Sequence, residues 1–425
     1  MHKIIPKKIA PVIETIQAEG GRPFLVGGAV RDALLGIDVA TKDLDFEIYH
    51  LSLDNLTALL SRFGRTDIVG RSFGVIKLWM KGVGELDFSL PRRESKTGAG
   101  HRGFIVAPDP SMSPEEACAR RDFTLNAVLM NPFDGELHDF FGGVDDLRSR
   151  VLRHTSDHFT EDPLRPLRAV QLAARFDFSM HEKTAALCAS MAEEARFLAK
   201  ERIFGEWSKW ALQGTSPAAG LRVLRQIDWC AVFPETAAVL PDDESALAMG
   251  TRVLRSRARA EQEGASVEDL QVLAIASLCL DMPSKAVESF LEKIGTPPKL
   301  EKRISLLCEE ARRFKTDPPA TDEAVLRTAV RMGGESTAML VRLLGGDFET
   351  AQTAAALLSS ARRLGVDAHP PKPLLAGRDL ARLGIAPGPQ MGRLLKAALE
   401  AQLRGDIATV EEATAWIRRE AEIPQ

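Results

Sequence analysis

A chain of 425 residues is long enough for roughly two to four domains, and its formal net charge of −4 excludes the overall basic field of nonspecific nucleic-acid binders. Its five cysteines are scattered without a CxxC pair, which argues against a disulfide framework or a zinc site and favours a reducing compartment. Because no apolar run approaches a membrane span and no signal-like segment opens the chain, we expect a soluble, cytoplasmic protein with no membrane contact.

The first element expected in chain order is a short amphipathic helix from Pro11 to about Glu19, stopped by Gly20-Gly21. From Phe24 to about Phe141, short β-rich runs alternate with helical segments. After Arg153 almost every run has helical character, punctuated by proline and glycine clusters. We therefore predict an α+β protein with an N-terminal α/β head and a long all-helical remainder.

Within the head, the stretch FLVGGAVRDALLGIDVATKDLDFEIY carries a Gly27-Gly28 turn before a short helix, then Asp43 and Asp45 in an apolar run. In a β-strand, alternate side chains share a face, so the two aspartates would project together while Leu44 points into the core. Adjacent carboxylates repel each other unless a divalent cation lies between them. A glycine pair before a helix lets backbone N–H groups approach a phosphate. The stretch therefore indicates a nucleoside-triphosphate site.

Either feature alone has a simpler interpretation, since a lone Gly-Gly is usually a turn and a lone Asp-x-Asp is usually a solvated strand edge. Their combination resembles a known signature. GGAVRDALLG followed by KDLDF is similar to the signature of the class II nucleotidyltransferases, the family of tRNA CCA-adding enzymes and bacterial poly(A) polymerases. The resemblance implies that Gly27, Gly28 and Arg31 bind nucleotide and that Asp43 and Asp45 are catalytic ligands of Mg²⁺.

A second β-rich run, ELDFSL, places Asp87 and Glu85 on one strand face. Asp87 beside Asp43 and Asp45 would complete the carboxylate set of a two-metal phosphoryl-transfer site, either as a metal ligand or as an assisting group. Alone, Asp87 would be an ordinary surface residue. The segment from Arg92 to Cys118 is rich in glycine, serine, proline and charge, and we expect a mobile lid loop there.

The segment ARRDFTLNAV closely matches the second motif of the same family. Arg121 can reach a phosphate, and Asp122 and Asn126 offer polar groups to a ribose or to its supporting loop. A helix start with Arg-Asp on the surface would explain this segment equally well on its own.

The third match is FTEDPLRPLRAVQLAARF, where Thr160 is expected to cap a helix whose first turn holds Asp162. Asp162 and Arg165 would then share a helix face, with Arg168 one turn further on. Cytosine and adenine present an amine donor beside a ring-nitrogen acceptor, and uracil and guanine present the reverse order. An Asp-Arg pair is therefore complementary to C and A, and the selection of these two bases is the role that the family assigns to this motif. A solvated salt bridge is the competing interpretation.

Further along, KERIFGEWSKWAL resembles the helical neck of the family. Some relatives carry an HD phosphohydrolase domain in the next region, and LAIASLCLDMPSK resembles its remnant, with Leu280-Asp281 in place of His-Asp. The chain has no histidine between His181 and His369, so we expect no His-ligated metal centre and no phosphatase activity there.

Near the C-terminus, residues 373–407 resemble the tail of bacterial CCA-adding enzymes, with a Gly-rich loop between two expected helices. Basic residues that could meet an RNA backbone are distributed along it, although such residues more often only solvate a helix face: Lys372, Arg378, Arg382, Arg393, Lys396 and Arg404. The final stretch lacks the strongly basic tail expected of a poly(A) polymerase, which favours a tRNA substrate recognised by its shape.

The resemblance implies a nucleotidyltransferase head at residues 1–150, a neck with a base-recognition helix at 151–215, a helical body at 216–350 and a tRNA-binding tail at 351–425. It also implies elongated helical parts and a monomer or weak homodimer. The leading interpretation is a tRNA nucleotidyltransferase that adds C and A from CTP and ATP with Mg²⁺. A CC-adding or A-adding enzyme and a poly(A) polymerase share the same motifs.

Two other classes of protein are also considered. An antibiotic or protein nucleotidyltransferase would share the glycine and aspartate motifs but would not need Asp162 and Arg165. A catalytically inactive RNA-binding protein would be expected to have lost a carboxylate, yet Asp43, Asp45 and Asp87 are all present.

Overall fold

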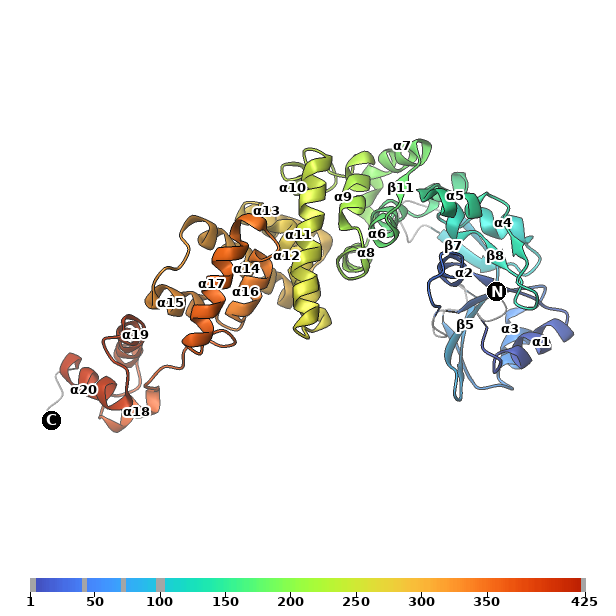
Figure 1. Cartoon of the computed structure of the whole chain (residues 1–425). Coiled ribbons are helices and arrows are strands. Elements are labelled where there is room, and N and C mark those ends of the chain that lie inside the picture. Colours follow the sequence, from blue (N-terminus) through green and yellow to red (C-terminus); the bar gives the residue numbers. More distant parts are fainter. Residues whose placement is uncertain (1–4, 40–43, 70–73, 97–103, 422–425) are drawn as a thin grey trace. The chain divides into compact units, whose positions relative to one another are not determined.

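The computed structural model describes residues 5–39, 44–69, 74–96 and 104–421 (Figure 1). The chain forms two compact units, Met1–Leu247 and Ala248–Gln425. The α/β head and the helices that follow it up to residue 247 therefore belong to one unit, and the finer four-part division stays a prediction. In the described part of the chain, no helix combines the length and the apolar composition needed to cross a bilayer.

The head is built on a mixed sheet whose strands run in the order β3-β4-β5-β2-β1-β8-β9. Its strands are β1 (Arg22–Val26), β2 (Asp45–Tyr49), β3 (Arg65–Val69), β4 (Val75–Met80), β5 (Gly84–Ser89), β8 (Leu129–Met130) and β9 (Leu137–His138). Strands β2 and β5 are parallel neighbours, and the other paired strands are antiparallel. A parallel pair brings residues that are distant in the sequence to the same end of the sheet.

One face of this sheet carries the main core of the head. The helices α1 (Ala10–Ala18), α2 (Gly28–Leu34) and α3 (Leu53–Leu60) supply apolar residues that pack with Phe46 and Phe88 of the strands. Val12, Ile13 and Ile16 form the buried side of α1, as predicted, and Gly20 follows the helix with a φ of 85° that favours glycine. The opposite face packs only partly, around Phe24, Val26 and Tyr49, and the remainder is left for the site described below.

The segment expected to be a lid loop contains regular structure, so that prediction was wrong in this respect. Strands β6 (Arg92–Lys96) and β7 (Phe104–Pro108) pair antiparallel as a separate hairpin. The helix α4 (Pro114–Ala119) follows, with Ser113 and Glu116 forming a capping box at its start. The polar composition of RRESK hid the first of these strands, because it lacks the alternating apolar pattern of a half-buried strand.

In chain order, η3 (Thr124–Asn126) comes before β8 and α5 (Gly143–Ser149) comes after β9, and β10 (Val151–Leu152) then forms a parallel ladder with β11 (Ser179–Met180). The helical part of this unit contains η4 (Asp157–Glu161), α6 (Arg165–Phe176), α7 (Glu182–Ser190), η5 (Ala192–Phe197), α8 (Lys200–Gln213), α9 (Pro217–Gln226) and α10 (Pro234–Ala237). Helix α6 packs against both α8 and α9. Gly220 of α9 makes this close approach possible, since a Cβ there would lie 2.6 Å from the Val170 carbonyl oxygen.

The predicted start of the third-motif helix was wrong. Thr160 does not cap a helix that contains Asp162; instead Ser156 caps η4, and α6 begins at Arg165. Asp162 is extended, with φ −121° and ψ 107°. The cause is Pro163, because the residue before a proline is sterically disfavoured from the helical region.

The second unit is helical in the part that the structure describes. Its elements are α11 (Asp243–Gln262, which begins before the unit boundary), α12 (Val267–Cys279), α13 (Ser284–Ile294), α14 (Pro298–Thr316), α15 (Asp322–Met332), α16 (Thr337–Leu344), α17 (Phe348–Arg363), α18 (Gly377–Arg382), α19 (Pro389–Arg404) and α20 (Val410–Glu420). Residues 272–279 of α12 are all buried, which makes this helix the core of the unit. Asp281, just beyond it, is bound by Arg252 at 2.7 Å and by Lys315 at 3.1 Å.

The tail has a small apolar core of its own, formed by residues of α18, α19 and α20 with Leu375 and Ile407. As predicted, a glycine-containing loop separates α18 from α19. Arg378 and Arg382 stand out from this core, with side chains 82% and 79% exposed. They are therefore available to a solvent-borne partner.

Candidate functional site

A pocket of about 410 Å³ lies on the partly packed face of the head sheet. Its lining joins residues from β2, β5, α4, α6 and the segments before η3 and α6: Val26, Asp45, Glu47, Val75, Asp87, Ser89, Leu90, Arg92, Ala117, Arg120, Arg121, Asp122, Asp162, Arg165 and Arg168. Most of the side chains singled out in the sequence therefore meet in one place. Asp43 lies outside the described residues. Arg31 and Asn126 lie behind the wall rather than on it.

The carboxylates are placed by strand pairing. In the parallel ladder of β2 and β5, Asp45 is directly opposite Asp87, so both project from the same face of the sheet. Asp87 Oδ1 is buried and accepts no hydrogen bond from the described residues, and the Lys77 ammonium lies 3.4 Å from it. A carboxylate oxygen held only by this long ion pair can still take a metal ion, because hard divalent cations prefer carboxylate oxygen. The Asp45–Asp87 pair thus fits a divalent cation.

The glycine turn adjoins this pair. Gly27 has a φ of 67°, in the region that favours glycine, and a Cβ built on it would lie 3.5 Å from Arg121 Nη1. Gly28 begins α2, where a Cβ would lie 3.4 Å from Arg31 Nη2. The turn therefore presents backbone and an adjacent guanidinium to the pocket side, and phosphate binding by Gly27 and Gly28 stays a prediction.

Arg31 has a structural set of contacts. Its guanidinium donates to Asn126 Oδ1 at 2.9 Å, pairs with Asp32 and lies over the Phe176 ring. Burial lowers the pKa of this arginine, which Asp32 partly offsets. Arg31 therefore joins α2 to η3 and to the end of α6, and its predicted direct role in nucleotide binding remains a prediction.

Asp122 is the centre of a buried polar network. Its Oδ1 accepts from Asn126 Nδ2 at 2.9 Å, and its Oδ2 accepts from Arg168 Nε at 2.8 Å and Nη2 at 2.7 Å. Burial alone would raise the pKa of this carboxyl, but Arg168 and Asn126 lower it well below its usual range. Asp122 in turn raises the pKa of Arg168. Arg168 therefore enters the pocket wall as a permanently charged group held in place by Asp122.

Asp162 and Arg165 lie on the same pocket but do not form the predicted helical pair. Asp162 accepts from Arg202 of α8 at 2.8 Å and from the Leu164 amide at 3.0 Å. Arg165 donates to the carbonyl oxygens of His158 at 2.8 Å and Arg120 at 2.6 Å. Each group is thus oriented by its own protein partners, which is the preorganisation that base recognition requires.

Several pocket residues were missed by the sequence interpretation. Glu47 lies two residues beyond Asp45 in β2 and shares its face, so strand alternation alone would have revealed it. Arg120 belongs to the second motif but was given no role of its own, although it lines the pocket and forms an ion pair with Glu161 at 2.7 Å. Lys77, which lies beside Asp87 but outside the pocket lining, could not have been found, because its position depends on the register of β4 against β5.

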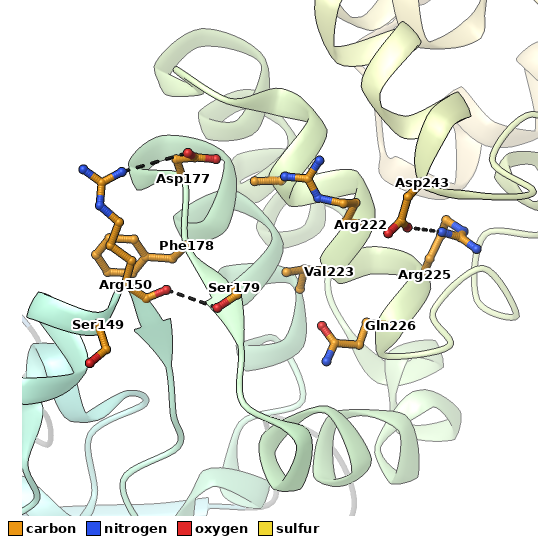
Figure 2. Close-up of a pocket in the computed structure, with 11 residues that line it drawn as sticks. Ser149, Arg150, Asp177, Phe178, Ser179, Arg222, Val223, Arg225, Gln226 and Asp243 are labelled. Carbon is orange, nitrogen blue, oxygen red and sulfur yellow. Dashed lines mark hydrogen bonds and ion pairs between the residues drawn. The ribbon is translucent and has the colours of Figure 1, made fainter.

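A larger hollow of about 640 Å³ lies at the other end of α6, where the β10–β11 ladder meets α9. Figure 2 shows Arg150 and Asp177 on one side of it and Arg222, with the Arg225–Asp243 ion pair, on the other. Among the residues that the structure describes, Arg222 has no ion-pair partner. This hollow has arginines but no adjacent carboxylate pair, so its chemistry suits an anion rather than a metal.

Three protein families match separate parts of the chain. Residues 23–153 match the Poly A polymerase head domain, residues 177–240 match the probable RNA- and SrmB-binding site of polymerase A, and residues 267–417 match the tRNA nucleotidyltransferase domain 2. The first match contains the glycine turn, the carboxylates and Asp122. The second match contains most of the wall of the arginine-lined hollow.

Relatives with similar sequences include the multifunctional CCA protein of Xylella fastidiosa strain M23, which is 43% identical over 224 residues, or 51% of each protein. That of Azoarcus sp. strain BH72 is 42% identical over 207 residues, which cover 48% of this chain and 47% of the relative. The chain thus spans about half the length of the curated relatives it matches.

Solved structures resemble almost the whole fold. The Bacillus stearothermophilus CCA-adding enzyme in complex with CTP has a TM-score of 0.73 at 22% identity, over 98% of each chain. The Thermotoga maritima CCA-adding enzyme complexed with tRNA has a TM-score of 0.61 at 22% identity, over 99% of this chain and 97% of that one. At this level of identity the likeness shows the fold, an α/β head followed by helices, as the sequence predicted.

Proposed function

We propose, from the chain's membership of the class II nucleotidyltransferase family of CCA-adding enzymes and bacterial poly(A) polymerases, that it adds C and A residues to the 3′ end of tRNA. CTP and ATP would be the substrates and pyrophosphate the released product. The observation that carries this proposal is the pairing of Asp45 with Asp87 in a pocket that also contains Arg121, Arg168 and Asp162. The groups proposed to bind phosphate, to hold metal and to select the base therefore line one cavity.

In this proposal Asp45, Asp87 and Asp43 would hold Mg²⁺, which would supply Lewis-acid activation of the attacking 3′ hydroxyl and charge neutralisation of pyrophosphate. The protein's own groups bind and orient the nucleotide. Arg121 beside Gly27 and Arg168 beside Asp122 are placed to hold the triphosphate. Burial would lower the pKa of Arg121, but Glu47 offsets this, and Asp122 raises the pKa of Arg168, so both guanidinium groups stay charged at neutral pH.

Base selection in this proposal belongs to Asp162 and Arg165. Asp162 can accept from the exocyclic amine of C or A, and Arg165 can donate to the neighbouring ring nitrogen. Their own partners hold the required orientation: Arg202 for Asp162, and two backbone carbonyls for Arg165. Uracil and guanine would present a carbonyl to Asp162 and an N–H to Arg165, which leaves both groups without a partner.

The tRNA would be bound by local basic surface, because the chain as a whole is not basic. Two surfaces support this. The hollow in Figure 2 contains the unpaired Arg222 and lies largely in the region that matches a probable RNA-binding site. The tail exposes Arg378 and Arg382.

One assay separates this proposal from its alternatives. Purified protein is incubated with tRNA lacking CCA, lacking CA or lacking A, and with each labelled nucleotide in turn. We expect C addition to the tRNAs that lack CCA or CA, and A addition only to the tRNA that lacks A alone. Extension by C alone would indicate a CC-adding enzyme, extension by A alone an A-adding enzyme, and equal A extension of an unstructured oligonucleotide a poly(A) polymerase.

A further inference from the structure

Glu47 brings an additional carboxylate to the carboxylate face of the head sheet. Asp45, Glu47 and Tyr49 alternate along β2, so they form one row that runs from the pocket into the core. Asp45 is exposed, the Glu47 side chain is 12% exposed, and Tyr49 is fully buried. The row therefore connects the metal-binding end of the strand to the apolar interior.

Both oxygens of Glu47 are engaged by protein. The Tyr49 hydroxyl donates to Oε2 at 2.5 Å, and Arg121 Nη2 donates to Oε1 at 3.2 Å. Tyr49 is itself held edge-to-face against Phe24, with ring centroids 5.8 Å apart. Glu47 is consequently anchored from the core and directed at Arg121 rather than at the opposite strand.

The consequence for Arg121 is a fixed guanidinium. Nη1 donates to the Asn126 carbonyl oxygen at 3.4 Å and adjoins the Gly27 turn, while Nη2 is held by Glu47. A free arginine side chain has many accessible rotamers, and part of that conformational entropy is lost when it binds a ligand. Fixing the side chain in advance removes part of that cost from the binding step.

We propose that Glu47, anchored by Tyr49, is a positioning residue that holds Arg121 at the Gly27 turn for the triphosphate of any incoming nucleotide. This inference rests on the proposed function for the identity of the ligand. It adds a residue outside the two-aspartate motif and separates triphosphate binding, through Glu47 and Arg121, from base selection, through Asp162 and Arg165.

The test compares Glu47→Ala, Glu47→Gln, Tyr49→Phe and Arg121→Ala in the full chain. Equilibrium dialysis with labelled CTP and ATP, without tRNA, measures binding, and steady-state kinetics give kcat and KM. In Glu47→Ala we expect Kd and KM to rise roughly tenfold, by the same factor for both nucleotides, with kcat within about twofold of wild type. Tyr49→Phe should give a smaller rise in the same direction.

Glu47→Gln is the rescue variant, because its amide can accept from Arg121 and donate to the Tyr49 oxygen; its Kd should stay within about twofold of wild type. In the Arg121→Ala background, Glu47→Ala should have no further effect. Asp54→Asn, an exposed change on α3, controls for loss of one charge.

Three outcomes would overturn the inference. Unchanged nucleotide binding in Glu47→Ala, with or without a lower Tm, would make Glu47 a structural residue only. A shifted Mg²⁺ requirement with unchanged metal-free binding would make it a metal ligand. Equal rises of Kd and KM in Glu47→Ala and Glu47→Gln would show that nucleotide binding depends on the negative charge of Glu47 and not on its hydrogen bonds to Arg121 and Tyr49. Failure of the tRNA-extension assay would leave the dialysis result intact, so the two proposals fail separately.

Discussion

Asp45 and Asp87 face each other across the parallel strands β2 and β5, and the register of that ladder alone sets their proximity. A pair held by two rigid strands keeps its spacing without help from a loop. The proposed metal site therefore assigns both residues to the same step.

We therefore expect Asp45→Ala or Asp87→Ala to reduce nucleotide incorporation by several orders of magnitude, while tRNA affinity changes little, because the carboxylates serve the chemical step. Single-turnover incorporation and filter binding measure the two effects. Asp54→Asn is the matched control, since Asp54 is exposed on α3. Near-normal turnover of Asp45→Ala with Mg²⁺ would refute the metal assignment.

Asp162→Ala removes the acceptor proposed for the amine of C and A, and one lost hydrogen bond to a charged group is worth about 1.5–3 kcal/mol. We expect kcat/KM for CTP and ATP to fall roughly ten- to hundredfold, with UTP and GTP less affected. Arg168→Ala should weaken all four nucleotides alike. The measurement is kcat/KM for each nucleotide on each variant.

Arg202 donates a hydrogen bond to Asp162 and so orients it. Arg202→Ala should therefore change the kcat/KM ratios between nucleotides in the same direction as Asp162→Ala, but less strongly. Unchanged ratios together with a lowered Tm would leave these residues as structural ion pairs. Arg165→Ala is less informative, because it also releases the carbonyl oxygens of His158 and Arg120.

Asp122 should make stability depend on pH. Its folded-state pKa is lowered, so its contribution is complete above the unfolded pKa of about 4 and is lost as pH falls toward the folded value. Asp122→Asn should lower the free energy of unfolding by about 1.5–3 kcal/mol at neutral pH. Urea unfolding should show this difference shrinking as pH is lowered below about 4. A constant difference at every pH would contradict the ionised pairing with Arg168.

Arg222→Ala tests the arginine-lined hollow in Figure 2. If Arg222 meets a phosphate of tRNA, the variant should weaken tRNA binding and reduce the slope of log K against log salt by roughly one or less. CTP and ATP binding should be unchanged. Arg62→Ala removes an exposed arginine, paired only with exposed Glu19 at 3.2 Å, and is the charge-matched control. If the slope of log K against log salt were the same for both variants, the hollow would not be part of the RNA-binding surface.

The sequence was sufficient for the local parts of this site. Strand alternation selected Asp45, and the family motifs selected Asp122 and Arg168, and all three line the pocket. Such features are readable because they depend on neighbours in the chain. The α/β head with helices after it followed from the change of pattern near residue 153.

The rest depended on contacts between distant segments. Strand register brings Lys77 close to Asp87, and the packing of α8 brings Arg202 to Asp162. The periodicity of apolar residues reveals neither contact. The wrongly predicted start of α6 has a local cause that is visible in the sequence. Pro163 disfavours the helical region for the preceding residue, Asp162.

The backbone links between the head and α6 also limit how the protein could exchange parts with its relatives. The Thr124 amide donates to the Arg153 carbonyl oxygen, the Thr155 amide donates to that of Asp122, and the Ser179 amide donates to that of Arg150. A hybrid joined near residue 150 would have to rebuild all of these bonds with a foreign sequence. The groups proposed to hold the triphosphate and those proposed to select the base would therefore be inherited together, and a donor's nucleotide preference would be transferred only with a segment that includes both the head and α6.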